Sequence, residues 1–309
     1  MHPLRFLVLS LSNVPWNELL RRYKHIEALG FDVAGVADHF VDWTNPSGPW
    51  FEATTLLGAL ARETTRIRLA AFVAQIPFRN PALLARQALT LDHMSNGRFE
   101  LGLGIGLTTD PAYGMMGLPN WPVKERVARF GEYVTVIDRL LANEVSSYKG
   151  RFYEVADAVM SPRPVQQPRP PIIIGAMGPV MMKHAARYAD VWNSYGTVEN
   201  FATHLSETRE RIRLIDEHCA TIGRDPTSLR RSFLMSDAEP RPGGGPFSYY
   251  ESPEIFAERV ERLLELGISE VGVFYPRRAD QIPAFEKIAA ETIPALKAKY
   301  ALRPPPQTT

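Results

Sequence analysis

The feature that most constrains the fold of this chain is its regular alternation between short apolar segments and longer amphipathic segments. The short segments have the composition of buried strands, and the longer ones carry apolar residues at helical spacing. The predicted strands are Arg5–Ser10, Val33–Asp38, Ile67–Ala74, Arg98–Ile105, Pro171–Met177, Val191–Gly196, Arg230–Ser236 and Glu270–Pro276. The predicted helices are Pro15–Leu29, Phe51–Glu63, Pro81–His93, Pro122–Asn143, Pro179–Tyr188, about Glu199–Ile222, Pro253–Leu266 and Ile282–Tyr300.

This alternation predicts an α/β fold with a parallel sheet and right-handed crossovers. Eight strand–helix pairs within 309 residues is the count of a closed (β/α)8 barrel. A doubly wound open sheet is the alternative, because periodicity alone does not distinguish a closed sheet from an open one. No linker divides the chain, so we expect a single domain over residues 1–309.

Two segments interrupt the pattern. Residues 144–170 contain a Lys149-Gly150 turn between aromatic-rich stretches, which predicts an inserted hairpin. Residues 237–252 form a glycine-rich loop after the seventh strand. Barrel active sites lie at the carboxyl ends of the strands, so this loop is either a mobile lid or an ordinary surface loop.

Composition and simple motifs exclude several kinds of partner. The formal net charge is +1, which gives no basic field for nucleic acid. Cys219 is the only cysteine, so no disulfide forms within the chain, as is typical of a cytoplasmic protein. The apolar run Phe6–Leu11 is too short to span a membrane. There is no HExxH motif or paired Cys/His spacing, so no metal site is expected.

The candidate catalytic residues follow the second strand, in the segment ADHFVDW. His39 is a candidate general acid or base, because histidine as a residue type exchanges protons near neutral pH; the alternative is a histidine held by Asp38 or by the backbone. Asp38 either orients His39 or caps the next turn. Trp43 either walls a flat aromatic ligand or fills the core.

Two glycine-containing segments are candidates for binding a ligand. In GAMGP, Gly175–Gly178 precedes a helix whose free N–H groups favour an anion, although an ordinary turn has the same pattern. In GLGIG, the strand continues through Gly102, Gly104 and Gly106, so the segment is no dinucleotide loop. These three glycines share one face of the strand, which suits the close approach of a ligand or of another backbone.

Two long motifs carry a family resemblance. RNPALLARQALTLDHMSNGRFELGLGIG and PPIIIGAMGPVMMKHAARYADVWN resemble characteristic segments of the bacterial luciferase-like family of flavin- and deazaflavin-dependent oxidoreductases. A weaker likeness extends from Arg5 to about Leu296. The family fold is a (β/α)8 barrel with insertions, usually assembled as a homodimer. This agrees with the number of strand–helix pairs found independently.

The resemblance implies where a cofactor binds. Its ring would stack near strands two to four, against a strand bulge with a cis peptide that aligns with Phe72–Val73. The implied cofactor-binding residues are Phe72, Val73, Gly104, Gly106, Gly175, Ala176, Met177 and Gly178, the last four for the phosphate. The implied cofactor is coenzyme F420 or FMN. F420 is favoured, because Asp38, His39 and Trp43 resemble the pattern of the F420-dependent branch, in particular its sugar-phosphate dehydrogenases.

One position separates this chain from both cofactor branches. Where the sugar-phosphate dehydrogenases place an acidic residue after strand four, and the luciferases an arginine, this chain has Leu107. Three hypotheses follow: F420-dependent hydride transfer, with His39 as acid or base; an FMN monooxygenase supplied by a separate flavin reductase; and a non-catalytic flavin-binding relative. Aromatic and methionine residues near the strand ends predict a largely apolar cavity for a small-molecule substrate: Trp50, Met115, Met116, Trp121, Phe247, Tyr249, Tyr250 and Tyr275.

Overall fold

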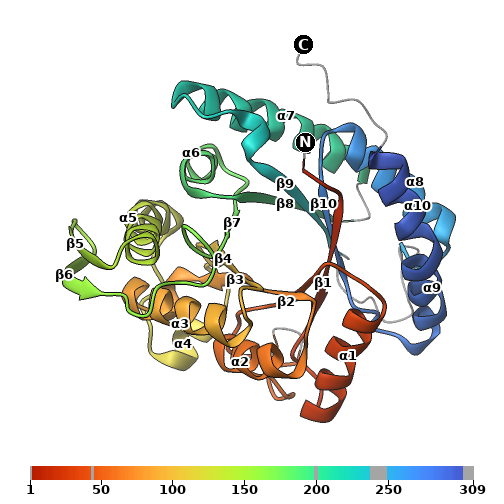
Figure 1. Cartoon of the computed structure of the whole chain (residues 1–309), viewed down its shortest axis with the longest axis horizontal. Helices are drawn as coiled ribbons and strands as arrows, with labels where there is room; N and C mark the ends of the chain where they lie inside the picture. The colour runs from red at the N-terminus through yellow and green to blue at the C-terminus, as the bar shows by residue number, and fades with distance from the viewer. Residues whose placement is uncertain (1, 43–44, 198–200, 237–248, 302–309) are drawn as a thin grey trace.

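The strands of this protein close into a barrel, as Figure 1 shows. The computed structural model describes residues 2–42, 45–197, 201–236 and 249–301. The eight barrel strands are all parallel, in the order β1-β10-β9-β8-β7-β4-β3-β2. They are β1 (Arg5–Ser10), β2 (Val33–Val36), β3 (Arg68–Gln75), β4 (Phe99–Gly104), β7 (Ile172–Gly175), β8 (Val191–Thr197), β9 (Arg230–Ser236) and β10 (Glu270–Phe274). Because β1 pairs with both β2 and β10, the predicted closed barrel is confirmed.

A ring of helices covers the outside of the strands (Figure 1). They are α1 (Trp16–Ala28), α2 (Ala53–Glu63), α3 (Pro81–Met94), α4 (Ala112–Met116), α5 (Val123–Ala142), α6 (Pro179–Tyr188), α7 (Phe201–Thr221), α8 (Pro253–Glu265), α9 (Ile282–Lys287) and α10 (Ile293–Ala301). Short 3-10 turns are at Ile76–Phe78, Pro226–Ser228 and Ala279–Gln281. A π-helical turn, Ile288–Thr292, joins α9 to α10, so the predicted last helix is continuous but irregular.

A short helix that is not among the predicted helices follows β4. The short helix α4 begins after Pro111, and the carboxylate of Asp110 accepts a hydrogen bond from the backbone N–H of Ala112 at 2.9 Å. It ends at Gly117, whose φ of 65° stops the helix. Gly114 in its middle weakens the helical pattern of the sequence, which explains the missed element.

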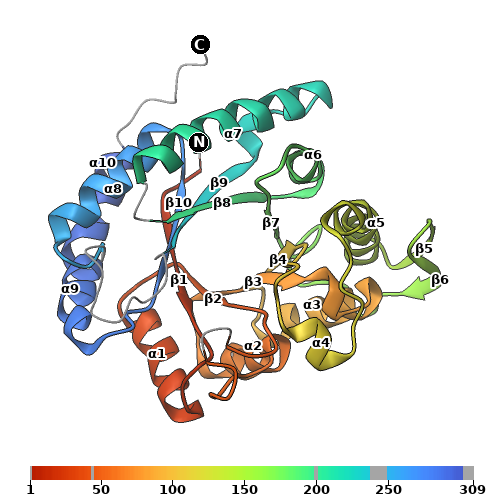
Figure 2. The same cartoon turned by 180° about the vertical axis from the view of Figure 1, so that it is seen from behind.

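The predicted hairpin insertion is confirmed. Strands β5 (Val145–Lys149) and β6 (Glu154–Val159) pair antiparallel and lie outside α5, away from the barrel (Figure 2). Glu132 of α5 accepts hydrogen bonds from three consecutive backbone N–H groups of the turn, at residues 151–153. Of the predicted lid loop, residues 237–248 lie outside the described residues.

The barrel interior has an apolar middle. Side chains of β1 alternate, so that Leu7 and Leu9 point inward while Phe6 and Val8 pack against the helices. The inward cluster consists of Leu7, Leu9, Val33, Ala37, Ala70, Phe72, Ile173 and Val191, with Leu11, Trp50, Leu234 and Phe274 partly buried against it. These four partly buried residues leave an apolar surface at the carboxyl end, where ligands of such barrels bind.

The opposite, amino-terminal end of the interior is closed by a cluster of buried charges. Arg5 of β1 makes two hydrogen bonds to Glu100 of β4, at 2.7 and 2.9 Å, and also pairs with Glu270 of β10. Arg68 of β3 pairs with the same Glu100. Burial alone would raise the pKa of Glu100, but the charges of Arg5 and Arg68 outweigh it and lower the pKa. These ion pairs therefore join four strands at the barrel floor.

The glycines of β4 make room for a bulge in β3. The register between the strands shifts so that Phe72 and Val73, joined by the cis peptide implied by the resemblance, lie opposite Gly102 alone. A Cβ atom on Gly102 would lie 2.1 Å from the carbonyl oxygen of Ala71, and one on Gly104 would lie 2.6 Å from a methyl group of Val73. Of the two predicted reasons for these glycines, close approach of a neighbouring strand accounts for both positions.

The variant Gly102→Ala tests this account. The new methyl group would overlap a backbone oxygen, which cannot move without breaking the bulge, so we expect a loss of about 1–3 kcal/mol in the free energy of unfolding. Urea denaturation measures the change. Gly114→Ala is the matched control, because its Cβ would meet open space, and it should not destabilise the protein. Equal stability of Gly102→Ala and wild type would refute the packing explanation.

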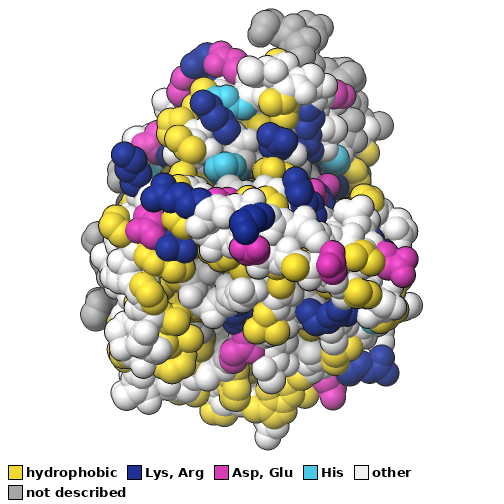
Figure 3. Space-filling model, turned by 90° about the vertical axis from the view of Figure 1, so that its left-hand side faces the viewer, with side chains coloured by type: hydrophobic (Ala, Val, Ile, Leu, Met, Phe, Trp, Pro, Cys, Tyr) yellow, Lys and Arg dark blue, Asp and Glu magenta, His cyan; other side chains and the backbone are white. Residues whose placement is uncertain are grey.

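The surface gives no indication of a charged partner on the face seen in Figure 3, where basic and acidic side chains are interspersed with apolar ones. Within the described part of the chain, no helix has the length and apolar character needed to cross a membrane.

Candidate active site

His39 lies just beyond the carboxyl end of β2, with its side chain 30% exposed. Its Nδ1 atom is 3.2 Å from a carboxylate oxygen of Asp110, in the loop after β4. The same Nδ1 is 3.2 Å from the side-chain amide nitrogen of Gln75, the last residue of β3. Three neighbouring strands therefore contribute to one polar cluster at the barrel mouth.

The carboxylate of Asp38 is paired with an arginine and not with His39. Its carboxylate makes two hydrogen bonds with the guanidinium of Arg79, at 2.6 and 2.8 Å, and accepts one from the backbone N–H of Gln75. Arg79 also pairs with Glu52, which caps α2. Asp38 is 2% exposed, so this ion pair is buried. The hypothesis that the carboxylate of Asp38 orients His39 is replaced by an indirect link, because the backbone oxygen of Asp38 accepts from the Gln75 side chain at 2.7 Å.

A fully buried arginine supports the same cluster from α5. Arg126 donates hydrogen bonds to the backbone oxygen of Ile105 at 3.0 Å and to the hydroxyl of Tyr113 at 2.7 Å, and its guanidinium lies over the Tyr113 ring. The Tyr113 hydroxyl in turn donates to Gln75 at 2.9 Å. A Cβ on Gly106, whose φ is 70°, would overlap these groups. The third glycine of the β4 segment is therefore required by this network.

Asp110 is the acidic member of the cluster. Burial would raise its pKa, but hydrogen bonds from His39, from the Ala112 backbone and from Gln75 outweigh it and lower the pKa of the carboxyl. Asp110 is therefore ionised at neutral pH. Over the described ranges, no group of three or more His, Cys, Asp and Glu side chains is arranged to hold a metal ion.

Trp50 forms an apolar wall beside His39. The two rings meet edge to face, with centroids 5.9 Å apart, and Trp50 also packs against the inward barrel cluster that contains Phe72. Its indole N–H is buried and has no hydrogen-bond acceptor among the described residues. Because a buried donor without an acceptor costs about 1–3 kcal/mol, a bound ligand with an acceptor atom at this point would be favoured.

Some of the other residues predicted to line the substrate cavity are exposed near the barrel mouth, and others are buried within the protein. Trp43 and Phe247 lie outside the described residues. Met115 and Met116 are exposed, as are Phe40 and Leu107, so apolar groups surround the barrel mouth on the side of β2 and β4. The predicted cavity role of Tyr249, Tyr250 and Tyr275 is not supported. These three are buried and hydrogen-bonded within the protein, and two of them pack against Phe285.

The turn between β7 and α6 has open space at the predicted phosphate site. Neither Gly175 nor Gly178 has any atom within 4 Å of the position a Cβ would occupy. Gly178 is the N-cap of α6 and provides no side chain to satisfy the first N–H groups of the helix. Ala176, in contrast, donates its N–H to Asn193 and accepts a hydrogen bond from Trp192, so its backbone polar groups are engaged within the protein.

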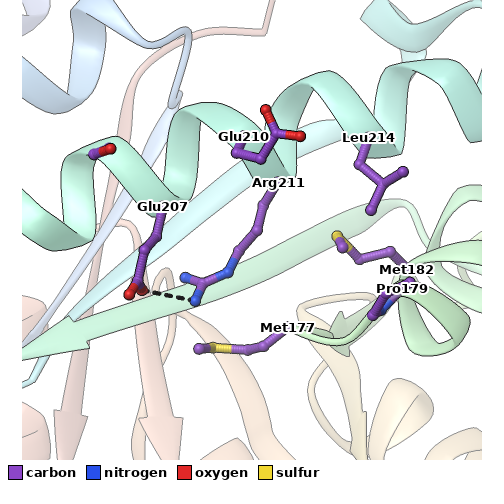
Figure 4. A pocket seen from close by; sticks show the side chains of 8 residues that line it. Met177, Pro179, Met182, Glu207, Glu210, Arg211 and Leu214 are labelled. Carbon is purple, nitrogen blue, oxygen red and sulfur yellow. Dashed lines mark hydrogen bonds and ion pairs between the residues drawn. The ribbon is translucent and has the colours of Figure 1, made fainter.

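A groove of about 440 Å³ lies next to this turn, between α6 and α7. Figure 4 shows Met177 and Met182 on one side of it, with Arg211 reaching down from α7 toward Met177. Arg211 is held by hydrogen bonds to Glu207 at 2.9 Å and to the hydroxyl of Ser194 at 3.3 Å. The groove is lined by Met177, Pro179, Met182, Ser206, Glu207, Glu210, Arg211 and Leu214.

Sequence reasoning missed Gln75, Asp110, Tyr113 and Arg126. Gln75 could have been found, because it is a polar residue at the end of a predicted strand. Asp110 carries a weaker signal, because it lies three residues beyond Leu107, the position at which the resemblance implies an acidic residue. Whether His39, Asp38, Trp43 and the eight cofactor-binding residues bind a ligand stays a prediction.

Comparison with known proteins identifies similar sequences over most of the chain. A family model described as luciferase-like monooxygenase matches residues 2–236. A protein named F420-dependent glucose-6-phosphate dehydrogenase from Microbacterium testaceum is 28% identical over an alignment of 345 positions that covers 97% of this chain and 99% of the relative. A pyrimidine monooxygenase RutA from Rhizobium rhizogenes is 35% identical over 190 residues, covering 60% of this chain and 50% of the relative.

Structural similarity extends over nearly the whole barrel. The solved structure of an F420-dependent secondary alcohol dehydrogenase, in complex with an F420-acetone adduct, matches with a TM-score of 0.78 and 20% identity, covering 94% of this chain and 100% of that one. At this identity the match supports the fold alone. Matches above 30% identity cover about half of the length of the curated relatives.

Proposed function

This chain belongs to the luciferase-like monooxygenase family, and we propose that it is an oxidoreductase whose F420 cofactor binds at the carboxyl end of the barrel. The cofactor ring would lie against the β3 bulge at Phe72 and Val73, next to Gly104 and Gly106 of the β4 segment. His39 and Trp50 would border it. When bound, F420 gives or takes a hydride. The protein supplies the orientation of the substrate and the group that moves a proton.

The observation that carries this proposal is the combination of His39 with the buried N–H of Trp50. The N–H needs an acceptor, and a carbonyl oxygen of the cofactor or of the substrate would provide one. His39 lies within ring contact of the same tryptophan. A titratable group and a donor without an acceptor therefore border one apolar surface, which is the usual composition of a small-molecule site.

The phosphate of the cofactor would bind at the start of α6. The open positions at Gly175 and Gly178 allow close approach, and the first N–H groups of a helix favour an anion. Met177 would contact the cofactor through its backbone, while Ala176 would hold the turn in place. The groove beside Met177 would receive the part of the cofactor that follows the phosphate.

The choice of F420 over FMN rests on the residues around His39. The F420-dependent pattern includes an acidic residue at the position where this chain has Leu107. Asp110, in the same loop, provides a carboxylate beside His39 instead. A relative that matches along 99% of its length is named F420-dependent. The alternative is an FMN monooxygenase supplied by a separate flavin reductase, and the RutA relative at 35% identity favours it.

The substrate would be a small and largely apolar organic molecule. Phe40, Leu107, Met115 and Met116 are exposed in the segments that follow β2 and β4. Such a border suits an apolar group better than a sugar phosphate, which needs hydrogen-bond donors and cations. His39 would accept the proton that leaves the substrate, or return it in the opposite direction. We also propose a homodimer that acts in the cytoplasm.

Titration of the purified protein with F420 and with FMN, oxidised and reduced, tests this function through the quenching of cofactor fluorescence or protein fluorescence. We expect F420 to bind at least about tenfold more tightly than either form of FMN, a difference of about 1.4 kcal/mol. Tight binding of reduced FMN alone would replace the proposal by the monooxygenase. Binding of neither cofactor would overturn both enzyme functions.

A further inference from the structure

The polar cluster around His39 determines which ring nitrogen carries the hydrogen. Three atoms form a triangle: His39 Nδ1, Asp110 Oδ2 and Gln75 Nε2, with separations of 3.2, 3.2 and 3.1 Å. A carboxylate only accepts hydrogen bonds, an amide NH2 group only donates them, and a ring nitrogen does either. Whether His39 Nδ1 donates or accepts a hydrogen bond therefore depends on the Asp110 carboxylate and on where the two hydrogens of Gln75 point.

The orientation of the Gln75 amide is fixed from both of its ends. The guanidinium of Arg126 has hydrogens only, so the Tyr113 oxygen accepts from it and the Tyr113 hydrogen is directed to Gln75 Oε1. At the other end, Nε2 faces the backbone oxygen of Asp38 at 2.7 Å, which only accepts. Both contacts place the NH2 group of Gln75 toward Asp38 and Asp110.

The two hydrogens of that NH2 group are thereby committed. One is donated to the Asp38 backbone oxygen and the other to Asp110 Oδ2, since a carboxylate is a stronger acceptor than a ring nitrogen. A lone pair on His39 Nδ1 would then face the lone pairs of the Asp110 carboxylate. Only a hydrogen on Nδ1, donated to Asp110, makes the contact attractive.

We propose that Asp110 is a positioning residue that holds neutral His39 with its hydrogen on Nδ1, so that the basic lone pair is on Nε2. Gln75 takes part by directing its own hydrogens away from the ring, and Tyr113 and Arg126 hold the Gln75 amide. The catalytic consequence, which is proton exchange at Nε2, rests on the proposed function. The assignment of the tautomer does not depend on that function.

Nitrogen NMR of histidine-labelled protein tests the proposal without cofactor or substrate. When the ring is neutral, the ring nitrogen shifts distinguish the nitrogen that bears hydrogen from the one that bears the lone pair. The signals of His39 are identified by their absence from His39→Gln. We expect hydrogen on Nδ1 in the wild type. Hydrogen on Nε2 in the wild type would overturn the proposal by itself.

The variant Asp110→Ala should invert the tautomer. Without the carboxylate, the second hydrogen of Gln75 is available to His39 Nδ1, which then accepts it, and the ring hydrogen moves to Nε2. Gln75→Leu, in contrast, should keep the wild-type tautomer, because Asp110 still accepts from Nδ1. Asp138→Ala, which removes a carboxylate paired with Arg169, is the control and should change nothing at His39. If Asp110→Ala keeps its hydrogen on Nδ1, Asp110 does not determine the tautomer.

This result is separate from the test of the proposed function. The expected tautomer together with a failure to bind either cofactor would reject the function and keep the inference. Cofactor binding together with the opposite tautomer would keep the proposed function and reject the inference about the tautomer.

Discussion

Replacing His39 with alanine should lower turnover by about 10²–10⁴-fold, the contribution typical of a positioned acid or base. Cofactor affinity should change much less, by about threefold or less, equivalent to about 0.7 kcal/mol. The reason is that His39 contacts Asp110, Gln75 and the Trp50 ring beyond β2, while the proposed phosphate site follows β7, which β3 and β4 separate from β2. The rate of hydride transfer in a single turnover and a fluorescence titration measure the two effects.

His93→Ala is the matched control for this variant. His93 is on α3 and contacts a backbone oxygen of the loop before β7, away from the barrel mouth, so its loss should leave turnover unchanged. Unchanged turnover in His39→Ala would mean that His39 only supports the structure. A loss of cofactor affinity as large as the loss of turnover would make it a binding residue instead.

The second large effect is expected at the floor of the barrel, far from the proposed site. Glu100→Gln keeps the size of the side chain and removes its charge, so Arg5 and Arg68 lose the carboxylate that they share. Removing one partner of a buried ion pair leaves an uncompensated charge, and we expect a loss of about 3 kcal/mol in the free energy of unfolding. Urea denaturation should show a lower midpoint with an unchanged slope.

Glu154→Gln is the control, because Glu154 forms an exposed ion pair with Lys149 and its loss should cost less than about 0.5 kcal/mol. The pH dependence provides a second check. The pKa of Glu100 is lower in the folded protein than its ordinary value of 4.5, so its contribution is complete above that pH and is lost as the pH falls further. The difference between wild type and Glu100→Gln should therefore shrink below pH 4.5. A difference that does not change with pH would contradict the ion-pair explanation.

The barrel could be predicted because each of its parts has a local signal. The strand at Arg5–Ser10 and the helix that follows it differ in hydrophobic period, and this difference repeats along the chain. The position of His39 at the barrel mouth could also be predicted, since the residues after a barrel strand lie at the ligand-binding end. The insertion at residues 144–170 had its own turn signal.

The contact between His39 and Asp110 and its support by Arg126 could not be predicted, because they are determined by tertiary contacts. Asp110 is 71 positions away along the sequence and lies in an irregular turn, so no periodicity marks it. Arg126 is on a helix whose pattern shows only that the residue faces inward, and its full burial depends on the backbone oxygens and the tyrosine that surround it. The same limit applies to Tyr249 and Tyr250, because an aromatic residue near a strand end has the same local pattern whether it lines a cavity or, as here, packs against other rings.

The most direct test of the central claim is a crystal structure of the protein with bound F420. The account predicts that the cofactor ring lies against Phe72 and Val73 with His39 and Trp50 at its edge, that the Trp50 N–H donates to a carbonyl oxygen of the cofactor or of a bound substrate, and that the phosphate contacts the backbone at Gly178. A cofactor bound elsewhere on the molecule, or with its phosphate away from the start of α6, would contradict the account.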